Sequence, residues 1–446
     1  MSNRQRTIVI VTEGASPDLL DRWDGAGLLP GFSQLRAQGS SGPLYAEGTP
    51  YEPPGLVSLL TGRRAADHGI YSYWTCHDPE YQPQTLTGKE RRHPLMWHLG
   101  DFRGLRFACV GLFGAHPPEP LDGSLITYPM YPTLHACHPK DLQRTLARKG
   151  IRPVHDVSIF WTGQPREELL PQLLTADIER GRTALALLAE HDVVIVNLTS
   201  IDRCSHIYWQ ELELGPQAER ESAVLAAYQT CDAVIRGALA ATDDSTNVIV
   251  FSEIGFGPLR AYRSINHVME QAGFLSMTDD GRVDWQRSCA FEAVQGTHGV
   301  NVNVHGRYKY GQVSAAAYDS VRAELSEALL SALNPSTGRP YFSAVPPREE
   351  VYPGEATELA PDLLLEPADW RYLPLGDPAW ASHVNRNWQS AWHRRESSWA
   401  GLGPGFRSGH QESRVASPVD VSATICALAG REKPAGWQGE SLAHNG

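Results

Sequence analysis

Acidic side chains follow three apolar segments of the chain, each close to the point where the segment ends. These side chains are Glu13, Asp202 and Glu253. The apolar segments have the length and composition of buried strands. Because the carboxyl ends of parallel strands meet along one crevice of a sheet, we expect the three carboxylates to lie in one site.

Asp202 and His206 are four residues apart, just after one of these segments. One helical turn would place both side chains on the same face, a geometry that suits a shared metal ion. Short pairs of this kind also occur without a metal, so the spacing becomes informative only together with the other carboxylates.

Glu52 lies in a block of a different character, Gly48–Gly62, in which prolines and polar residues precede an apolar run. The run predicts the opening turns of a buried helix, with Glu52 at its positive end. A carboxylate there is either a cap or dipole partner of the helix or a functional group, and the block alone leaves both interpretations open.

The elements that must position these residues alternate along the chain as strands and helices, which predicts an α/β fold with a parallel sheet. The expected strands are Thr7–Val11, Leu105–Gly111, Val193–Leu198 and Asn247–Phe251. One expected helix begins near Asp18, and three others cover Arg166–Glu190, Glu219–Thr242 and Asp420–Ala429.

The pattern loosens between about residues 259 and 355, where an alternating segment at 296–307 precedes an amphipathic helix at 314–333. We interpret this region as a smaller inserted or cap-like unit within a single domain of residues 1–446. The core is expected to resume at Pro361, and the tryptophan-rich stretch Trp370–Trp399 is expected to be loop-like.

Composition excludes several classes of partner. The 446 residues carry a formal net charge of -12, which argues against a nucleic-acid or anionic-membrane surface. No apolar run reaches the roughly 20 residues of a membrane span, and the N-terminus leads directly into a strand. We therefore expect a cytoplasmic protein that acts on a small-molecule substrate; the oligomeric state and the substrate-binding residues are not predicted.

The seven cysteines are scattered and form no CxxC pair, so neither a disulfide framework nor a structural zinc site is indicated.

The order of several blocks resembles the alkaline phosphatase superfamily, specifically its type I phosphodiesterase and nucleotide pyrophosphatase branch. The blocks are Gly27–Leu35, Ser58–Gly62 with His68 and Gly69, Asp202 with His206, Ser252–Gly257, Asn301–Arg307, Pro361–Leu363 and Val419–Thr424. The resemblance covers most of the chain. It implies an alkaline-phosphatase-like, mainly parallel sheet flanked by helices, with two metal ions at the carboxyl ends of the central strands.

The resemblance implies that one metal ion is held by Asp202, His206 and His393, where His393 matches a distant histidine of the family. One carboxylate and two imidazoles suit zinc, and equally suit iron or manganese.

At the second metal site the sequence departs from the family. Glu13 stands at the position of the family's first aspartate, and Glu253 with Ile254 replaces its Asp-His pair. Glu52 stands where the family has its Ser or Thr nucleophile. The usual phosphoryl-enzyme route is therefore not expected.

Three interpretations of these glutamates remain open. In the first, Glu13, Glu52 and Glu253 hold a second divalent cation, and a metal-bound water replaces the missing nucleophile in hydrolysing or transferring a phosphate-like ester. Arg203, His298 or Arg307 would then neutralise the anion.

In the second interpretation, four carboxylates and two imidazoles form a dinuclear iron or manganese centre of an oxidase or oxygenase. In the third, the protein is a catalytically inactive metal-binding protein. We place the hydrolase slightly ahead of the oxidase because hydrolysis is the habit of the superfamily, which is an argument by analogy since function belongs to the site rather than to the fold.

Overall fold

The structure is a computed structural model that describes residues 5–131, 133–154, 163–335, 337–374 and 389–444. Two compact units are present. Unit 1 combines residues 1–64, 87–257 and 390–446, and unit 2 combines residues 65–86 and 258–389. Every residue that the sequence nominated as a metal ligand belongs to unit 1.

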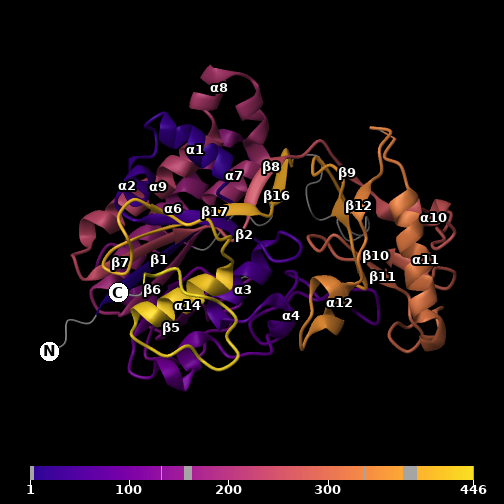
Figure 1. Cartoon of the computed structure of the whole chain (residues 1–446), viewed down its shortest axis with the longest axis horizontal. Coiled ribbons are helices and arrows are strands. Elements are labelled where there is room, and N and C mark those ends of the chain that lie inside the picture. The colour runs from indigo at the N-terminus through magenta and orange to yellow at the C-terminus, as the bar shows by residue number, and fades with distance from the viewer. Residues whose placement is uncertain (1–4, 132, 155–162, 336, 375–388, 445–446) are drawn as a thin grey trace. The chain divides into compact units, whose positions relative to one another are not determined.

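Unit 1 is built around a nine-stranded sheet with the order β18-β2-β17-β7-β1-β6-β3-β4-β5 (Figure 1). Five neighbouring strands, β7, β1, β6, β3 and β4, are parallel. The sheet strands are β1 (Arg6–Thr12), β2 (Ser40–Tyr45), β3 (Phe107–Val110), β4 (Gly123–Ile126), β5 (Cys137–His138), β6 (Val193–Leu198), β7 (Thr246–Phe251), β17 (Glu396–Leu402) and β18 (His410–Gln411). A separate pair joins β8 (Gly255–Pro258) and β16 (Ala391–Arg394).

Helices cover both faces of this sheet (Figure 1). The helices of unit 1 are α1 (Pro17–Gly25), α2 (Pro30–Gln38), α3 (Glu52–Thr61), α5 (Leu142–Arg148), α6 (Arg166–Leu188), α7 (Ser200–Tyr208), α8 (Pro216–Arg220), α9 (Ala223–Ala241) and α14 (Pro418–Leu428), with 3-10 turns η1 (Met96–His98), η2 (Gly100–Phe102) and η3 (Trp209–Glu213). The expected mainly parallel α/β fold is confirmed.

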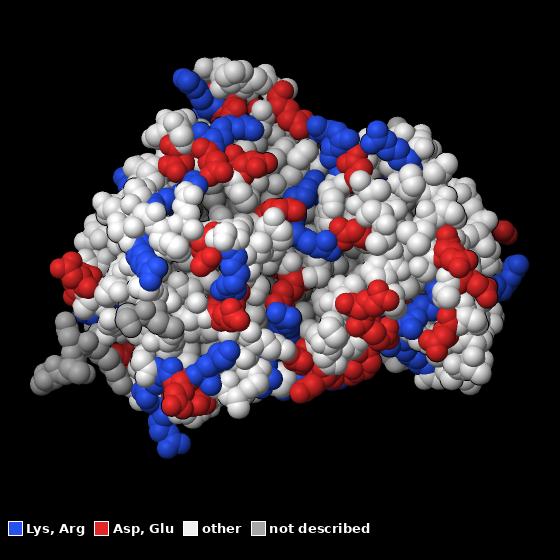
Figure 2. Space-filling model, viewed as in Figure 1, with Lys and Arg blue, Asp and Glu red and all other residues white. Residues whose placement is uncertain are grey.

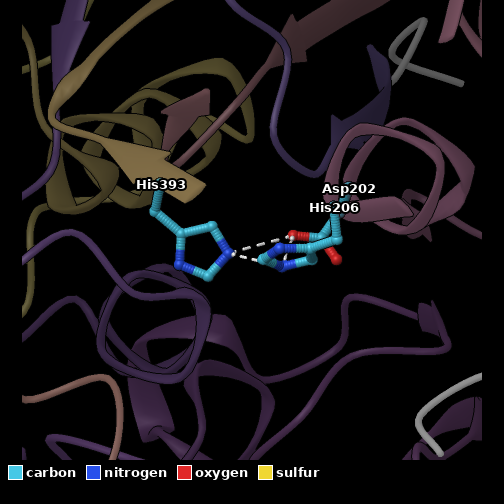
Figure 3. Close-up of side chains that lie close together, drawn as sticks. All are labelled: Asp202, His206 and His393. Carbon is cyan, nitrogen blue, oxygen red and sulfur yellow. Dashed lines mark hydrogen bonds and ion pairs between the residues drawn. The ribbon is translucent and has the colours of Figure 1, made fainter. Parts of the chain in front are cut away.

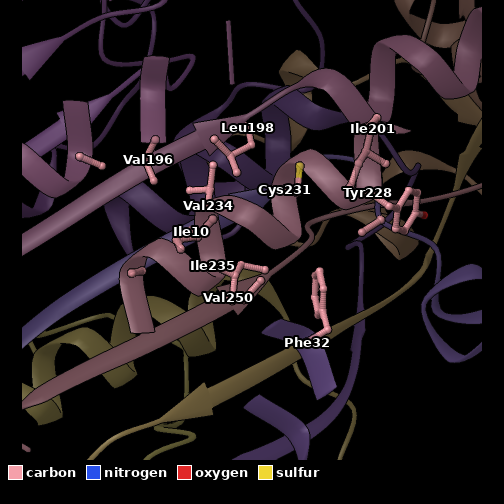
Figure 4. Packing of buried hydrophobic residues seen from close by; sticks show 14 of the residues in the cluster. Ile10, Phe32, Val196, Leu198, Ile201, Tyr228, Cys231, Val234, Ile235 and Val250 are labelled. Atoms are coloured by element: carbon pink, nitrogen blue, oxygen red, sulfur yellow. The ribbon is translucent and has the colours of Figure 1, made fainter. Parts of the chain in front are cut away.

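The largest core lies between the sheet and α9. Ile10 and Val250 pack there with Tyr228, Cys231 and Ile235 (Figure 4). Because side chains alternate between the faces of a strand, Val9 and Val11 point to the opposite face, where α3 packs against α14 (Figure 1). The central strands are thus buried on both faces, which explains their continuous apolar runs.

Unit 2 contains a three-stranded sheet, two smaller strand pairs and short helices. Its elements are α4 (Ala65–His68), β9 (Ala261–Arg263), α10 (Ile265–Gln271), β10 (Ala290–Glu292), β11 (Gly299–Val302), η4 (Ala315–Ala317), α11 (Tyr318–Ser331), β12 (Phe342–Ala344), α12 (Arg348–Val351), η5 (Thr357–Leu359), β13 (Leu363–Leu364), β14 (Glu366–Pro367) and β15 (Tyr372–Pro374). The inserted region was expected at about 259–355; unit 2 extends to residue 389 and takes in residues 65–86.

Two sequence-based expectations about elements are wrong. Leu363–Leu364 does not rejoin the central sheet, because β13 pairs with β11 in unit 2. Within the stretch expected to be loop-like, residues 391–394 and 396–402 are strands, and β17 lies between β2 and β7. The strand at 396–402 was not predicted because the tryptophan-rich sequence lacks a clear strand pattern and its pairing partners are distant in the chain. Residues 375–388, which include His383, lie outside the described residues.

Among the described residues, no helix is both long and apolar enough to cross a membrane. Acidic and basic side chains are interspersed on the face shown in Figure 2. All seven cysteines are free.

The start of α7, the helix that carries Asp202 and His206, is anchored by Asp177 of α6. The Asp177 carboxylate accepts hydrogen bonds from the backbone N–H of Thr199 (2.9 Å) and of Ser200 (2.8 Å). Arg180, also buried, lies 3.5 Å from the same carboxylate. Asp177 therefore satisfies amides at the helix start and fixes where the helix leaves the sheet.

We expect Asp177→Ala to lower the free energy of unfolding by about 3–5 kcal/mol, because it leaves a buried arginine without its carboxylate. Asp232→Ala is the matched control. Asp232 accepts hydrogen bonds from the N–H of Gly31 and Phe32 at the start of α2. Urea unfolding with metal titration distinguishes the two: the first variant should also bind metal more weakly, and the second should not. Unchanged metal binding in a destabilised Asp177→Ala would contradict the anchoring role.

Candidate metal centre

The ends of three parallel strands and the start of α3 bring the nominated side chains into the interior of unit 1. Glu13 follows β1, Glu253 follows β7, and Asp202 lies in the helix that follows β6. Glu13, Glu52, Asp202, Glu253 and His393 are all buried. His206 is partly exposed at its side chain, with a relative accessibility of 12%.

Asp202, His206 and His393 form one group of potential ligands, the histidine group (Figure 3). The Nε2 atom of His393 lies 3.1 Å from Nε2 of His206 and 3.2 Å from Oδ1 of Asp202. The same Oδ1 lies 3.5 Å from Nε2 of His206. Asp202 and His206 come from one turn of α7, and His393 comes from β16, which pairs with β8. The distant histidine thus reaches the pair through strand pairing.

The tautomer of His206 follows from its backbone partner. Its Nδ1 lies 3.1 Å from the carbonyl oxygen of Ala391, which can only accept a hydrogen bond. Nδ1 therefore carries the proton and Nε2 offers a lone pair to the group. Histidines that bind metals are commonly oriented by a partner of this kind.

Glu13, Glu52 and Asp202 form a second group, in which one oxygen of each carboxylate lies within 4.8 Å of the others. Asp202 belongs to both groups. Glu52 is the first residue of α3 and also reaches toward the histidine group, with its Oε2 3.7 Å from Nδ1 of His393. Glu52 was expected just ahead of the helix, and its position in the first turn keeps it at the positive helix end.

Arg203 lies among the carboxylates of this second group. Its Nη1 contacts Asp202 and lies 3.8 Å from Oε1 of Glu52, and its Nη2 lies 3.6 Å from Oε1 of Glu13. Nη2 also donates to the hydroxyl oxygen of Tyr128 at 3.2 Å. The guanidinium is the positive charge that neighbours all three carboxylates.

Glu253 belongs to neither of the two groups. Its side chain is completely buried, and among the described residues neither carboxylate oxygen has a hydrogen-bond partner. A Cβ added at Gly55 would stand 2.7 Å from Cβ of Glu253, so glycine at this point of α3 allows the close approach. The carboxylate senses the charges of Glu13 and Asp202.

Two turns next to the strand ends are tied together by Ser252. Its Oγ accepts hydrogen bonds from the N–H of Gly14 and Ala15, both at 3.0 Å, and donates to the carbonyl oxygen of Ile254. Gly14 has a φ of 87°, and a Cβ there would meet the ring of Phe256 at 2.7 Å. Ser252 thus links the turn at Glu13 to the turn at Glu253.

Burial shapes the acid-base properties of the site. Burial raises the pKa of Glu52 well above its usual range, with the charges of Asp202 and Glu13 adding to the effect and Arg203 opposing it. Burial, with the charge of Glu13, likewise raises the pKa of Glu253. Burial also acts to raise the pKa of Asp202, but Arg203 and His206 outweigh it, so this pKa is lowered.

The two imidazoles are kept neutral. Burial lowers the pKa of His206 to about 3, against the opposing effect of Asp202. Burial also lowers the pKa of His393. Neutral imidazoles are the form that binds a metal ion.

The donors fit a divalent metal ion at the histidine group. Two neutral imidazoles and one ionised carboxylate, with Nε2 of His206, Nε2 of His393 and Oδ1 of Asp202 3.1–3.5 Å from one another, match a three-ligand site with open positions. The second group, Glu13, Glu52 and Asp202, is called the acidic group below. It offers only oxygens, which suit harder cations. Arg203 lies among these three carboxylates.

Sequence reasoning missed two residues at this site. Asn197 donates from Nδ2 to Oε2 of Glu13 at 2.6 Å, and its position in an otherwise apolar strand was the available signal. Tyr128 follows a short strand in a proline-rich stretch, and nothing in its surroundings marked it.

Of the three residues that the sequence suggested for binding an anion, one lies at the metal centre and two lie in unit 2. Arg203 lies at the site, whereas Arg307 is paired with Asp362 inside unit 2, with Nη1 2.9 Å from Oδ1. His298 also belongs to unit 2, where it lies near Trp370.

Comparison with known proteins adds a family. The family model for type I phosphodiesterase / nucleotide pyrophosphatase matches residues 7–396. No curated protein matches the chain.

Among solved structures, the chain is similar to phosphonoacetate hydrolase from Sinorhizobium meliloti 1021 in complex with phosphonoformate. The TM-score is 0.63 at 14% identity, with 96% of each chain covered. It is also similar to murine ectonucleotide pyrophosphatase / phosphodiesterase 5, with a TM-score of 0.56 at 12% identity, covering 99% of this chain and 97% of that one. At such identities the likeness shows the fold.

Glu253→Gln should stabilise the metal-free protein at pH 8 by about 1–3 kcal/mol, because it removes a buried charge that has no hydrogen-bond partner. The raised pKa of Glu253 means that its ionisation opposes folding, so stability falls as pH rises above 4.5 through the raised value. The variant should lose this part of the pH dependence.

Urea unfolding of the metal-free protein between pH 5 and 8 measures the effect. Glu270→Gln, at an exposed position of α10, is the control and should change stability by less than about 0.5 kcal/mol. A Glu253→Gln protein less stable than wild type at pH 8 would contradict the assignment of an uncompensated buried carboxylate.

Proposed function

Because the chain belongs to the type I phosphodiesterase / nucleotide pyrophosphatase family, we propose that it is a metal-dependent hydrolase of phosphate-like esters that works without a Ser or Thr nucleophile. The observation that carries the proposal is the group of Asp202, His206 and His393, whose three potential ligand atoms lie 3.1–3.5 Å from one another. Glu13, Glu52 and Glu253 would serve a second divalent ion together with Asp202, which belongs to both groups of ligands.

A divalent ion held by these residues would supply Lewis acidity: it would lower the pKa of a bound water to about 7 and polarise a phosphoryl oxygen. The ion would be zinc, manganese or iron, since one carboxylate with two imidazoles suits all three. Residues of the chain hold and orient the metal ligands. The carbonyl oxygen of Ala391 fixes the His206 tautomer, and Asp177 fixes the helix that carries Asp202.

Glu52 takes the place of a nucleophile in the family pattern, but its surroundings favour another role. Its two oxygens face Arg203 and His393, at 3.8 and 3.7 Å. A carboxylate that faces the second nitrogen of a metal-binding histidine orients that ring and raises its basicity. We therefore assign Glu52 to holding the centre together, and attack on phosphorus to water.

The substrate class follows from the family and the charges. The similar structures are named as a phosphonoacetate hydrolase and as ectonucleotide pyrophosphatases / phosphodiesterases, so a phosphodiester, a nucleotide and a phosphonate are the first substrates to test. An anionic substrate requires the positive charge of metal ions, because four buried carboxylates repel it.

One observation favours a second candidate, a non-heme iron or manganese oxidase or oxygenase. The nominated donors comprise four carboxylates and two imidazoles, a carboxylate-rich set, and the buried side chains of Ile254 and Phe256 follow Glu253. Against it, both imidazoles lie in one group of ligands.

His393→Ala should reduce metal affinity more than about 100-fold, beyond the 10–100-fold that loss of an outer-shell partner costs. Hydrolysis of bis(p-nitrophenyl) phosphate, nucleotides and phosphonoacetate should fall with the metal content. His410→Ala, on the short edge strand β18, is the control and should retain both.

Elemental analysis of protein grown with zinc, manganese and iron, followed by phosphate-release and oxygen-consumption assays, distinguishes the candidates. Metal-dependent release of phosphate or alcohol supports the hydrolase. Oxygen turnover by iron-loaded protein without ester hydrolysis would replace it with the oxidase, and metal binding without any turnover would leave a metal-binding protein.

A further inference from the structure

Arg203 stands in the space that a metal ion bound to the acidic group would need. Its two terminal nitrogens reach Asp202, Glu52 and Glu13, with Nη1 3.8 Å from Glu52 and Nη2 3.6 Å from Glu13. These are the three carboxylates whose oxygens lie within 4.8 Å of one another. The guanidinium therefore contacts or neighbours the same three carboxylates that would ligate an ion.

Metal ligation and this ion-pair network exclude each other at close range. A zinc-like ion needs carboxylate oxygens at about 2.0–2.2 Å. A guanidinium beside the same oxygens takes their lone pairs and repels a second cation. Tyr128, which accepts a hydrogen bond from Nη2 at 3.2 Å, helps to keep the fork in place.

Charge balance allows either the Arg203 guanidinium alone or a second divalent ion to accompany the carboxylates of the acidic group. The four nominated carboxylates carry four negative charges, and Arg203 with one divalent ion at the histidine group supplies three positive ones. A second divalent ion would bring the total to one net positive charge, provided that Arg203 stays nearby. Arg203 and a second divalent ion therefore compete for the position beside the three carboxylates, and the total charge of the site does not decide between them.

We propose that Arg203 is the resident cation of the acidic group, so that the protein holds one divalent ion tightly at Asp202, His206 and His393 and admits a second only when Arg203 moves aside. The inference rests on the proposed metal-dependent function and specifies how that site is loaded. Arg203 acts as a positioning residue: its side chain is 11% exposed and lies on the first turn of α7, next to Asp202.

The arrangement also provides the acidic group with a cation that does not depend on metal. Burying several carboxylates together is costly unless a cation accompanies them. Arg203 supplies that cation during folding, before any ion is bound. Glu253 is compensated less: the charge of Arg203 acts to lower its pKa, but burial and the charge of Glu13 outweigh that effect, and neither carboxylate oxygen has a hydrogen-bond partner among the described residues.

Titration of metal-free protein with Mn²⁺ by isothermal calorimetry, with elemental analysis as a check, tests the inference. Wild type should bind one equivalent tightly and a second at least tenfold more weakly. Arg203→Met should tighten the second equivalent at least tenfold and leave the first unchanged. Arg203→Lys, which keeps the charge, should bind the second equivalent within threefold of wild type.

Arg36→Met controls for the loss of one positive charge from unit 1, because Arg36 pairs with Asp21 and Asp24, which are not among the nominated metal ligands. It should match wild type in both binding steps. Circular dichroism and retention of the first ion show that each variant is folded.

Two results would overturn the inference. One is a wild-type protein that binds two equivalents with equal affinity, a measurement that needs no variant. The other is a folded Arg203→Met protein with the second affinity of wild type. Absence of any ion at the histidine group, with His393→Ala identical to wild type, would instead overturn the proposed function.

Discussion

The burial of like charges at the end of the central sheet is the constraint on which the rest of unit 1 depends. Glu13, Glu52, Asp202 and Glu253 are all withdrawn from water within one region. Each ionised carboxylate in such a setting costs several kcal/mol unless a cation or hydrogen-bond donors compensate it. The raised pKa values of Glu52 and Glu253 and the lowered pKa of Asp202 reflect how unevenly that compensation is distributed.

Much of the surrounding structure serves this compensation. Arg203 and Asn197 bring donors to Glu13, and Asp177 holds the helix that carries Asp202 and His206. The fold positions the groups by two different devices. Parallel strands deliver Glu13 and Glu253, and the β8-β16 pair delivers His393 from nearly 140 residues further along the chain than Glu253. A metal ion is the natural remaining partner for this set of donors.

The sequence predicted the parts that depend on local pattern. The apolar runs that became β1, β6 and β7 were visible because strands buried on both faces are almost wholly apolar. The convergence of Glu13, Asp202 and Glu253 near one edge followed from the geometry of parallel strands. The four-residue spacing correctly placed Asp202 and His206 on one turn of α7, since helical periodicity is a local property.

The remaining parts depend on contacts between distant segments, which one sequence does not display. His393 was identified only through the family resemblance, and its strand was taken for a loop because its pairing partner lies far away in the chain. Arg203 had the right residue type for an anion site, but nothing local showed that its side chain turns toward three carboxylates. The sequence also did not show that residues 65–86 and 258–389 form one unit, because the two segments are far apart in the chain.

The central claim is that Asp202, His206 and His393 hold a divalent ion. Anomalous diffraction from crystals grown with one equivalent of zinc or manganese tests it directly, because the signal locates the ion independently of activity. We expect one anomalous peak about 2.0–2.2 Å from Nε2 of His206, Nε2 of His393 and a carboxylate oxygen of Asp202. A well-ordered crystal with no peak among these atoms, or with its first peak elsewhere, would contradict it.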